Sequence, residues 1–173
     1  MANRNEGGGV DGLFARQKEP VAKSLDSAAI FNMKKILNHI PFFSQRSQHE
    51  WKERGFPSRE EAADWEDRSC GMACLKMIFD AQGRYGERTF FDHIKDAETK
   101  EIYKKGIGCI HQKIADELNA NGIESSTVKI TDPDEFKSHL ENGGIFIVSI
   151  GPGLRGERKS GHLVPLIGYV EED

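Results

Sequence analysis

The segment 70–81, CGMACLKMIFDA, constrains the fold most strongly, because it is apolar on almost every side. At helical spacing its small and apolar side chains form one broad face, and further apolar side chains cover much of the rest. Only Lys76 and Asp80 are expected to face water, and Gly83 is placed to stop the helix. A helix of this composition must be packed on most sides, so we expect it near the centre of the fold.

The remaining pattern consists of short helices followed by a few late strands. Caps and apolar periodicity predict further helices at 58–63, 88–97, 109–120 and 132–140. Apolar runs of strand length predict strands at 126–130, 145–150 and 163–170. Helices first and a small sheet afterwards favour an α+β domain in which the two are segregated.

The chain length allows one domain with a substantial core. Residues 1–20 are rich in glycine and charge and predict a disordered tail. Residues 21–39 carry apolar positions at helical spacing and predict an N-terminal helix or strap. The folded domain is expected over 40–173.

Charge and composition restrict the partners and the compartment. The formal net charge of −4 provides no basic field for nucleic acid, so no nucleic-acid partner is expected. No apolar run approaches the roughly 20 residues of a spanning helix, and the N-terminus does not resemble a secretory signal. The three cysteines are odd in number and too few for a disulfide framework, which favours reduced thiols and a cytoplasmic location.

Cys70 stands where the helical periodicity begins, and this position can activate a thiol. A cysteine with an ordinary pKa near 8.5 is mostly protonated at neutral pH, whereas the first turn of a helix supplies free N–H groups and a positive field. Gly71 leaves space beside it, and His162 enters a strand after a glycine-rich loop, where it can serve as a base. From the residues alone, a core cysteine and an ordinary polar histidine are the commoner explanation of this pattern, and the catalytic pair is the alternative.

Several segments of the chain, among them the one around Cys70, resemble those of a known peptidase family. The run Ser69 to Ile78 resembles the nucleophile helix of the bacteriocin-processing, double-glycine-leader peptidases and their stand-alone relatives in the papain-like cysteine peptidase superfamily. Ile40 to Gln45 is similar to the opening segment of that family, and Gly106 to Gly122 to its middle segment. The strands 145–150 and 161–169 resemble the pair that carries the histidine of the family. The resemblance covers most of the chain from Ile40 onward and implies a papain-like fold.

The resemblance also implies roles. Cys70 would attack a carbonyl, His162 would take and return the proton, and Gln45 with the Cys70 backbone N–H would hold the oxyanion. Gln45 lies far upstream of Cys70, whereas the transporter-linked members keep this glutamine a few residues ahead, so Asp67 competes for the role. The expected partner is a peptide or protein substrate. Its sequence and the oligomeric state stay open.

The residue that should orient the histidine is expected to be missing. The family places an Asp or Asn on the strand after the histidine strand, but this sequence ends at Asp173. Eleven residues of strand from His162 would put Asp173 on the order of 30 Å away, at about 3.3 Å per residue. We therefore expect a domain truncated at its C-terminus, with a catalytically silent, peptide-binding domain of the same fold as the alternative to an active peptidase.

Neither a metal nor a cofactor is expected from the sequence. The segment 151–156 formally fits a dinucleotide fingerprint, but no helix follows it, which favours a lip over the cleft instead. Cys70, Cys74, Cys109 and His111 offer enough zinc ligands, yet at spacings that are poor for zinc.

Overall fold

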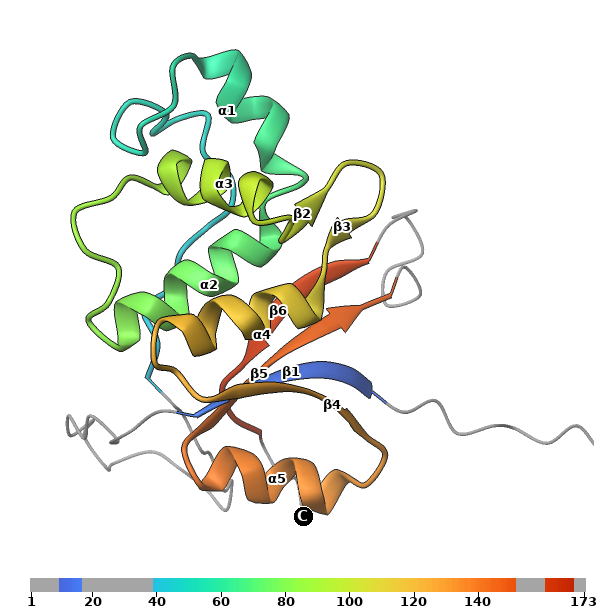
Figure 1. Ribbon diagram of the computed structural model, residues 1–173. Helices are drawn as coiled ribbons and strands as arrows, with labels where there is room; N and C mark the ends of the chain where they lie inside the picture. The colour runs from blue at the N-terminus through green and yellow to red at the C-terminus, as the bar shows by residue number, and fades with distance from the viewer. Residues whose placement is uncertain (1–9, 17–38, 152–160, 170–173) are drawn as a thin grey trace, which may run out of the picture.

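The computed structural model describes residues 10–16, 39–151 and 161–169, and these form an α+β architecture with a small antiparallel sheet (Figure 1). The expected fold class is confirmed at this level. The helices are α1 (Arg59–Glu66), α2 (Cys70–Ala81), α3 (Phe90–Thr99), α4 (His111–Ala120) and α5 (Pro133–Glu141). The strands are β1 (Val10–Arg16), β2 (Tyr103–Lys104), β3 (Gly108–Cys109), β4 (Ser125–Ile130), β5 (Gly144–Ile150) and β6 (His162–Leu166).

The main sheet has the order β4-β1-β5-β6, and every neighbouring pair in it is antiparallel. In the register of β5 and β6, Ile150 lies opposite His162 and Ser149 opposite Leu163. The strand β6 therefore lies at an edge of the described sheet and keeps one row of backbone groups free for other elements. The strands β2 and β3 form a separate small hairpin.

The strand β1 corrects the prediction of a disordered tail over residues 1–20. It lies in the middle of the sheet, between β4 and β5, with Phe14 opposite Phe146. Leu13 and Ala15 face the main core while Phe14 faces the other side, which is the alternation of a strand covered on both faces. The folded domain therefore includes a segment upstream of Ile40. The rest of the predicted tail and nearly all of the predicted strap, 17–38, lie outside the described residues.

Two hydrophobic cores lie on the two faces of the sheet. On one face, side chains such as Ile145, Ile147 and Leu163 pack with α2, α3 and α4. On the other face, Phe146 and Val148 pack with α5. In Figure 1, α2 and α4 accordingly lie on one side of the sheet and α5 on the other. Eight of the twelve residues of α2 are buried, so the expected central helix is confirmed.

The helix boundaries follow their caps. Ser58 caps α1, Thr89 forms a capping box at the start of α3, and Asp132 caps α5. The helix expected at 109–120 begins two residues later than predicted, because Cys109 belongs to β3 and pairs with Tyr103. The strand expected at 163–170 is shorter and ends at Leu166.

None of the helices in the described part of the chain is both long and apolar enough to span a membrane.

Candidate active site

Cys70 is the first residue of α2, as the sequence predicts, and it is partly exposed. The preceding residue, Ser69, makes no side-chain cap hydrogen bond, so the first N–H groups of the helix stay available. The backbone N–H groups of Leu163 and Gly71 both favour negative charge on the Cys70 sulfur and lower the pKa of its thiol. The Leu163 N–H comes from the edge strand β6, which brings the sheet to the start of the helix.

The surroundings of Cys70 lower the pKa of its thiol. The largest cause is a hydrogen bond from the thiol of Cys109, and partial burial opposes it. The backbone N–H of Leu163, the nearby His162 and the N–H of Gly71 add to the lowering. All four groups favour negative charge on sulfur, so the site stabilises a thiolate.

Two hollows open on either side of Cys70. The first, which we call the loop hollow, has a volume of about 250 Å³ and lies between the start of α2, the strand β6 and the segment 42–46. Cys70, His162 and Gln45 all line it, so the three residues named from the sequence meet in one place. They come from positions up to 117 residues apart in the chain, and only the tertiary fold unites them.

The insertion between Gln45 and Cys70 folds back on itself and thereby returns Gln45 to the nucleophile. The Gln45 amide N–H donates to the backbone carbonyl of Glu66, at the end of α1. The Glu66 carboxylate in turn accepts from the Gln48 backbone N–H at 2.9 Å and from its side-chain amide at 3.3 Å. A primary amide has two N–H donors, so one hydrogen of Gln45 fixes its position and the second is available to the hollow.

Arg54 holds the same segment from its other side. Its guanidinium donates to the Ser44 carbonyl at 2.5 Å and to the Ser47 hydroxyl at 3.2 Å, and it lies 4.3 Å from the centre of the Phe43 ring. It is also paired with Glu50. The long insertion therefore supplies a clamp that immobilises the wall of the loop hollow.

The second hollow, the hairpin hollow, has a volume of about 400 Å³ and lies between the start of α2, the β2–β3 hairpin and the start of α4. Cys70 and Leu163 line it as well as the loop hollow. Asp67, the competitor of Gln45, lies here and not in the hollow that contains His162. The arrangement brings Gln45, rather than Asp67, together with the pair Cys70 and His162.

His162 begins β6, where its strand position and its place in the loop hollow agree with the sequence prediction. Among residues 10–16, 39–151 and 161–169, no carboxylate or amide side chain hydrogen-bonds to its ring. Asp173, the residue weighed for this role, lies outside the described residues, as does most of the glycine-rich segment 151–156.

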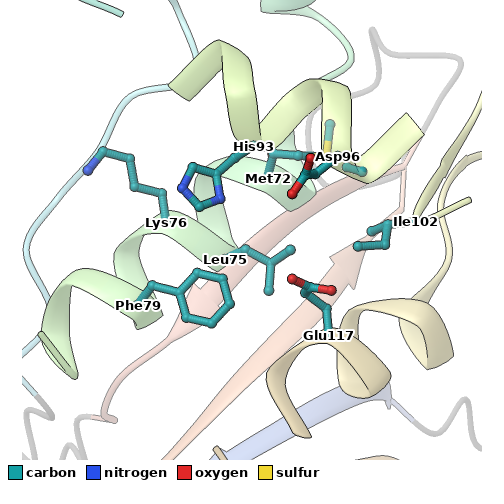
Figure 2. Close-up of a pocket in the computed structure, with 9 residues that line it drawn as sticks. Met72, Leu75, Lys76, Phe79, His93, Asp96, Ile102 and Glu117 are labelled. Atoms are coloured by element: carbon teal, nitrogen blue, oxygen red, sulfur yellow. The ribbon is translucent and has the colours of Figure 1, made fainter. Parts of the chain in front are cut away.

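A third, much smaller pocket lies on the opposite side of α2, between α2, α3 and α4 (Figure 2). Its volume of about 10 Å³ is close to the lower limit for one water molecule. Burial lowers the pKa of His93 at its edge. The pocket is too small for a substrate, so we assign it to the packing of the core.

Cys109 is the residue of this site that the sequence did not reveal. It was expected inside a helix, but it ends β3 and its thiol contacts Cys70. A Cβ atom on Gly71 would lie 2.6 Å from the Cys109 sulfur, so Gly71 is needed for this contact. Glycine directly after a helix-initial cysteine was the available signal, but the pattern does not identify the partner. Within the described residues, no three His, Cys, Asp or Glu side chains are arranged to hold a metal ion.

No family model, no curated protein and no solved structure matches this chain.

Proposed function

We propose that the chain is a cysteine peptidase with a papain-like fold, which hydrolyses a peptide or amide bond through an acyl-enzyme intermediate. The observation that carries the proposal is the position of Cys70 at a helix start, in one hollow with His162 and Gln45 and beside groups that lower the pKa of its thiol. Nucleophile, base and oxyanion donor are the three groups that acyl transfer requires.

In the first half of the reaction, the Cys70 thiolate attacks the carbonyl carbon of the substrate. The carbonyl oxygen becomes an oxyanion, which accepts hydrogen bonds from the free amide hydrogen of Gln45 and from the Cys70 backbone N–H. His162, which holds the proton taken from the Cys70 thiol, then donates it to the amine nitrogen, the C–N bond breaks, and the amine leaves. The acyl group remains as a thioester on Cys70.

In the second half, His162 accepts a proton from a water molecule that attacks the thioester carbonyl. The same donors hold the second oxyanion, the C–S bond breaks, and the carboxylic acid is released. Cys70 returns to its starting state. The reaction needs a reduced sulfur, and the three free cysteines are consistent with the reducing cytoplasmic location expected from the sequence.

The sequence resemblance supports the narrower proposal that the chain is a stand-alone relative of the double-glycine-leader peptidases. The resembling segments are those that line the loop hollow: the segment ending in Gln45, the start of α2, and β6 with His162. An extended peptide suits this arrangement, because the loop hollow and the hairpin hollow both reach Cys70. The side-chain preference is left to experiment.

The proposal is tested by labelling the full chain at pH 7 with a peptidyl chloromethyl ketone and mapping the modified cysteine by mass spectrometry. Cys70 should react much faster than Cys109, and Cys70→Ala should abolish the hydrolysis of a mixed peptide library. The proposal is wrong if Cys70 reacts no faster than Cys109 and if Cys70→Ala leaves hydrolysis unchanged. Saturable peptide binding without any cleavage would instead identify the silent, peptide-binding domain.

A further inference from the structure

Cys109 packs directly against the residue that follows the nucleophile. A Cβ atom on Gly71 would lie 2.6 Å from the Cys109 sulfur and 2.8 Å from its Cβ, both closer than real Cβ atoms approach. On another side the Cys109 sulfur is 3.7 Å from the Met72 sulfur. The Cys109 side chain is thus wedged against the first turn of α2.

The two thiols face the same space. Cys70 and Cys109 both line the hairpin hollow, and the Cys109 thiol, which donates to the Met72 sulfur at 3.7 Å, lies close enough to the Cys70 sulfur to lower its pKa. Both are free thiols. A dithiol that shares an open hollow can be reached by a small oxidant and can be bridged without first unfolding the protein.

Cys74 is the other cysteine near Cys70, but it is badly placed for a bridge. It follows Cys70 by four residues on the same helix, and such positions hold their Cβ atoms about 5–6 Å apart. A disulfide needs about 3.8 Å between Cβ atoms. Cys74 is also buried, with 1% of its surface exposed, and burial raises the pKa of its thiol. Of the two other cysteines, Cys109 is therefore the better candidate, because it shares the hairpin hollow with Cys70 and is partly exposed.

We propose that Cys109 is a resolving thiol, which forms a reversible disulfide with Cys70 after a hydroperoxide has oxidised Cys70. The Cys70–Cys109 disulfide would be a modification that leaves Cys70 without a free thiolate and blocks the place where the two hollows meet. The loss of hydrolysis rests on the proposed function, whereas the formation of the bridge does not.

The steps balance with a hydroperoxide as the oxidant. The Cys70 thiolate attacks one peroxide oxygen, the O–O bond breaks, and Cys70 becomes a sulfenic acid, while the other oxygen takes the proton released by the Cys70 thiol and leaves as water or an alcohol. The Cys109 sulfur then attacks the Cys70 sulfur, the S–O bond breaks, and the hydroxyl leaves with the Cys109 proton as water. Two thiols have lost two electrons and the peroxide has gained them. An external thiol restores both residues by exchange.

The order of the steps follows from the charges. In the reduced site, the hydrogen bond to Cys70 and the negative charge of its sulfur raise the pKa of Cys109, so Cys109 stays protonated. Oxidation of Cys70 to a sulfenic acid removes that negative charge. Cys109 then loses its proton more readily at the moment when its attack is needed.

The test treats the full chain with a several-fold molar excess of hydrogen peroxide, because oxidation to a sulfinic acid consumes two equivalents, and then maps the cysteines by mass spectrometry without reduction. The reagent iodoacetamide reports free Cys70 before oxidation, after oxidation and after dithiothreitol. The expected product is a peptide pair that links Cys70 to Cys109 within one chain. Because such a bridge is reversible, dithiothreitol should restore roughly nine-tenths or more of the iodoacetamide labelling of Cys70.

In the variant Cys109→Ser, no bridge can protect Cys70 from further oxidation. Cys70 should therefore proceed to the sulfinic acid, and dithiothreitol should no longer restore its labelling. Cys109→Ala serves as a second variant if the first does not fold, as judged by circular dichroism, and Cys74→Ala is the matched control that should still form the bridge. The proposal is overturned if Cys70 links to Cys74, if only chain-to-chain links form, or if Cys109→Ser recovers as fully as the native chain. Failure of the proposed function has a different signature: the chain forms the reversible bridge on oxidation, but the reduced chain hydrolyses no peptide.

Discussion

The two sides of α2 differ in almost every property that matters for chemistry. On the sheet side, the helix begins at an open hollow of about 250 Å³, and the pKa of Cys70 is lowered. On the side of α3 and α4, the pocket of about 10 Å³ is nearly filled, and burial lowers the pKa of His93 (Figure 2). The first environment stabilises a negative charge on the Cys70 sulfur and the second disfavours a positive charge on His93, although the same helix forms a wall of both.

The difference arises from what each side of the helix meets. Toward the sheet, the helix start meets the edge of β6, whose Leu163 N–H is free to donate to sulfur. Toward α3 and α4 the side of the helix packs its Met72, Leu75 and Phe79 against Ala97 and Ile102, and His93, Asp96 and Glu117 line the rim of the small pocket between them. A helix end beside a strand edge supplies donors, whereas a helix side beside other helices supplies packing. The predictions below separate these two roles.

The largest effect on the open side is expected from His162→Ala. General acid and base catalysis contributes about 10²–10⁴-fold to such reactions, so kcat for peptide hydrolysis should fall by that order. The pH dependence of Cys70 alkylation should also move to higher pH, because His162 helps to lower the pKa of the thiol. Stopped-flow alkylation with iodoacetamide measures this shift. His111→Ala, in the hairpin hollow, is the matched control, and equal losses in both variants would show that His162 is not the base.

Gln45→Ala should come next in size. Removal of one oxyanion donor costs on the order of 10²–10³-fold in kcat, with little change in the alkylation of Cys70, which forms no oxyanion. Gln48→Ala is the matched control, because Gln48 also hydrogen-bonds to Glu66 but does not line the loop hollow. Steady-state kinetics with a cleaved peptide separates kcat from KM. If Gln48→Ala lowers kcat as much as Gln45→Ala, the effect comes from loop structure and the oxyanion role fails.

The comparison also explains which parts could be predicted from the sequence. The position of Cys70 at a helix start and of His162 at a strand start are local features, written in consecutive residues, and both are confirmed. The buried helix α2 and the capped helices are local in the same sense. Assignment of Gln45 needed the family resemblance, because its approach to Cys70 depends on the way the insertion folds back through Glu66.

Features that depend on distant partners escaped prediction. The strand β1 is a short apolar run between glycines and charges, and only its pairing with both β4 and β5 makes it a central strand. The sequence predicts a helix that includes Cys109, because the apolar periodicity of α4 extends back to this residue. Its pairing with Tyr103 and its contact with Gly71 are tertiary, and no spacing within the sequence encodes them.

On the closed side, Leu75→Ala should reduce stability without reducing reactivity. Leu75 is 6% exposed and lines the filled pocket, so its truncation is expected to cost about 3 kcal/mol of the free energy of unfolding. Urea denaturation followed by circular dichroism measures this loss. Alkylation of Cys70 in the folded variant should keep its native rate. Met77→Ala is the contrasting variant, because Met77 is equally buried but lines the loop hollow, and it should change both stability and peptide binding.

The smallest effect is expected from the pH dependence of stability around His93. Burial lowers the pKa of His93 first, the positive charges of Arg88 and Lys76 lower it further, and Asp96 and Asp92 oppose them. Since the folded pKa lies below the unfolded value of about 6.5, the unfolded chain binds the proton more readily. The titration of His93 should therefore leave the free energy of unfolding unchanged above about pH 6.5 and lower it as the pH falls through the unfolded and then the folded pKa.

The variant His93→Phe keeps an aromatic ring at this position but cannot titrate. The melting temperature of the native chain should fall more between pH 7 and pH 5 than that of His93→Phe, as measured by differential scanning fluorimetry at constant ionic strength. Because His93 lies behind α2, the pH profile of Cys70 alkylation should be the same in both chains. Equal pH dependence of the two melting temperatures would show that His93 is solvated rather than packed, and a shifted Cys70 profile would show that the two sides of α2 are coupled.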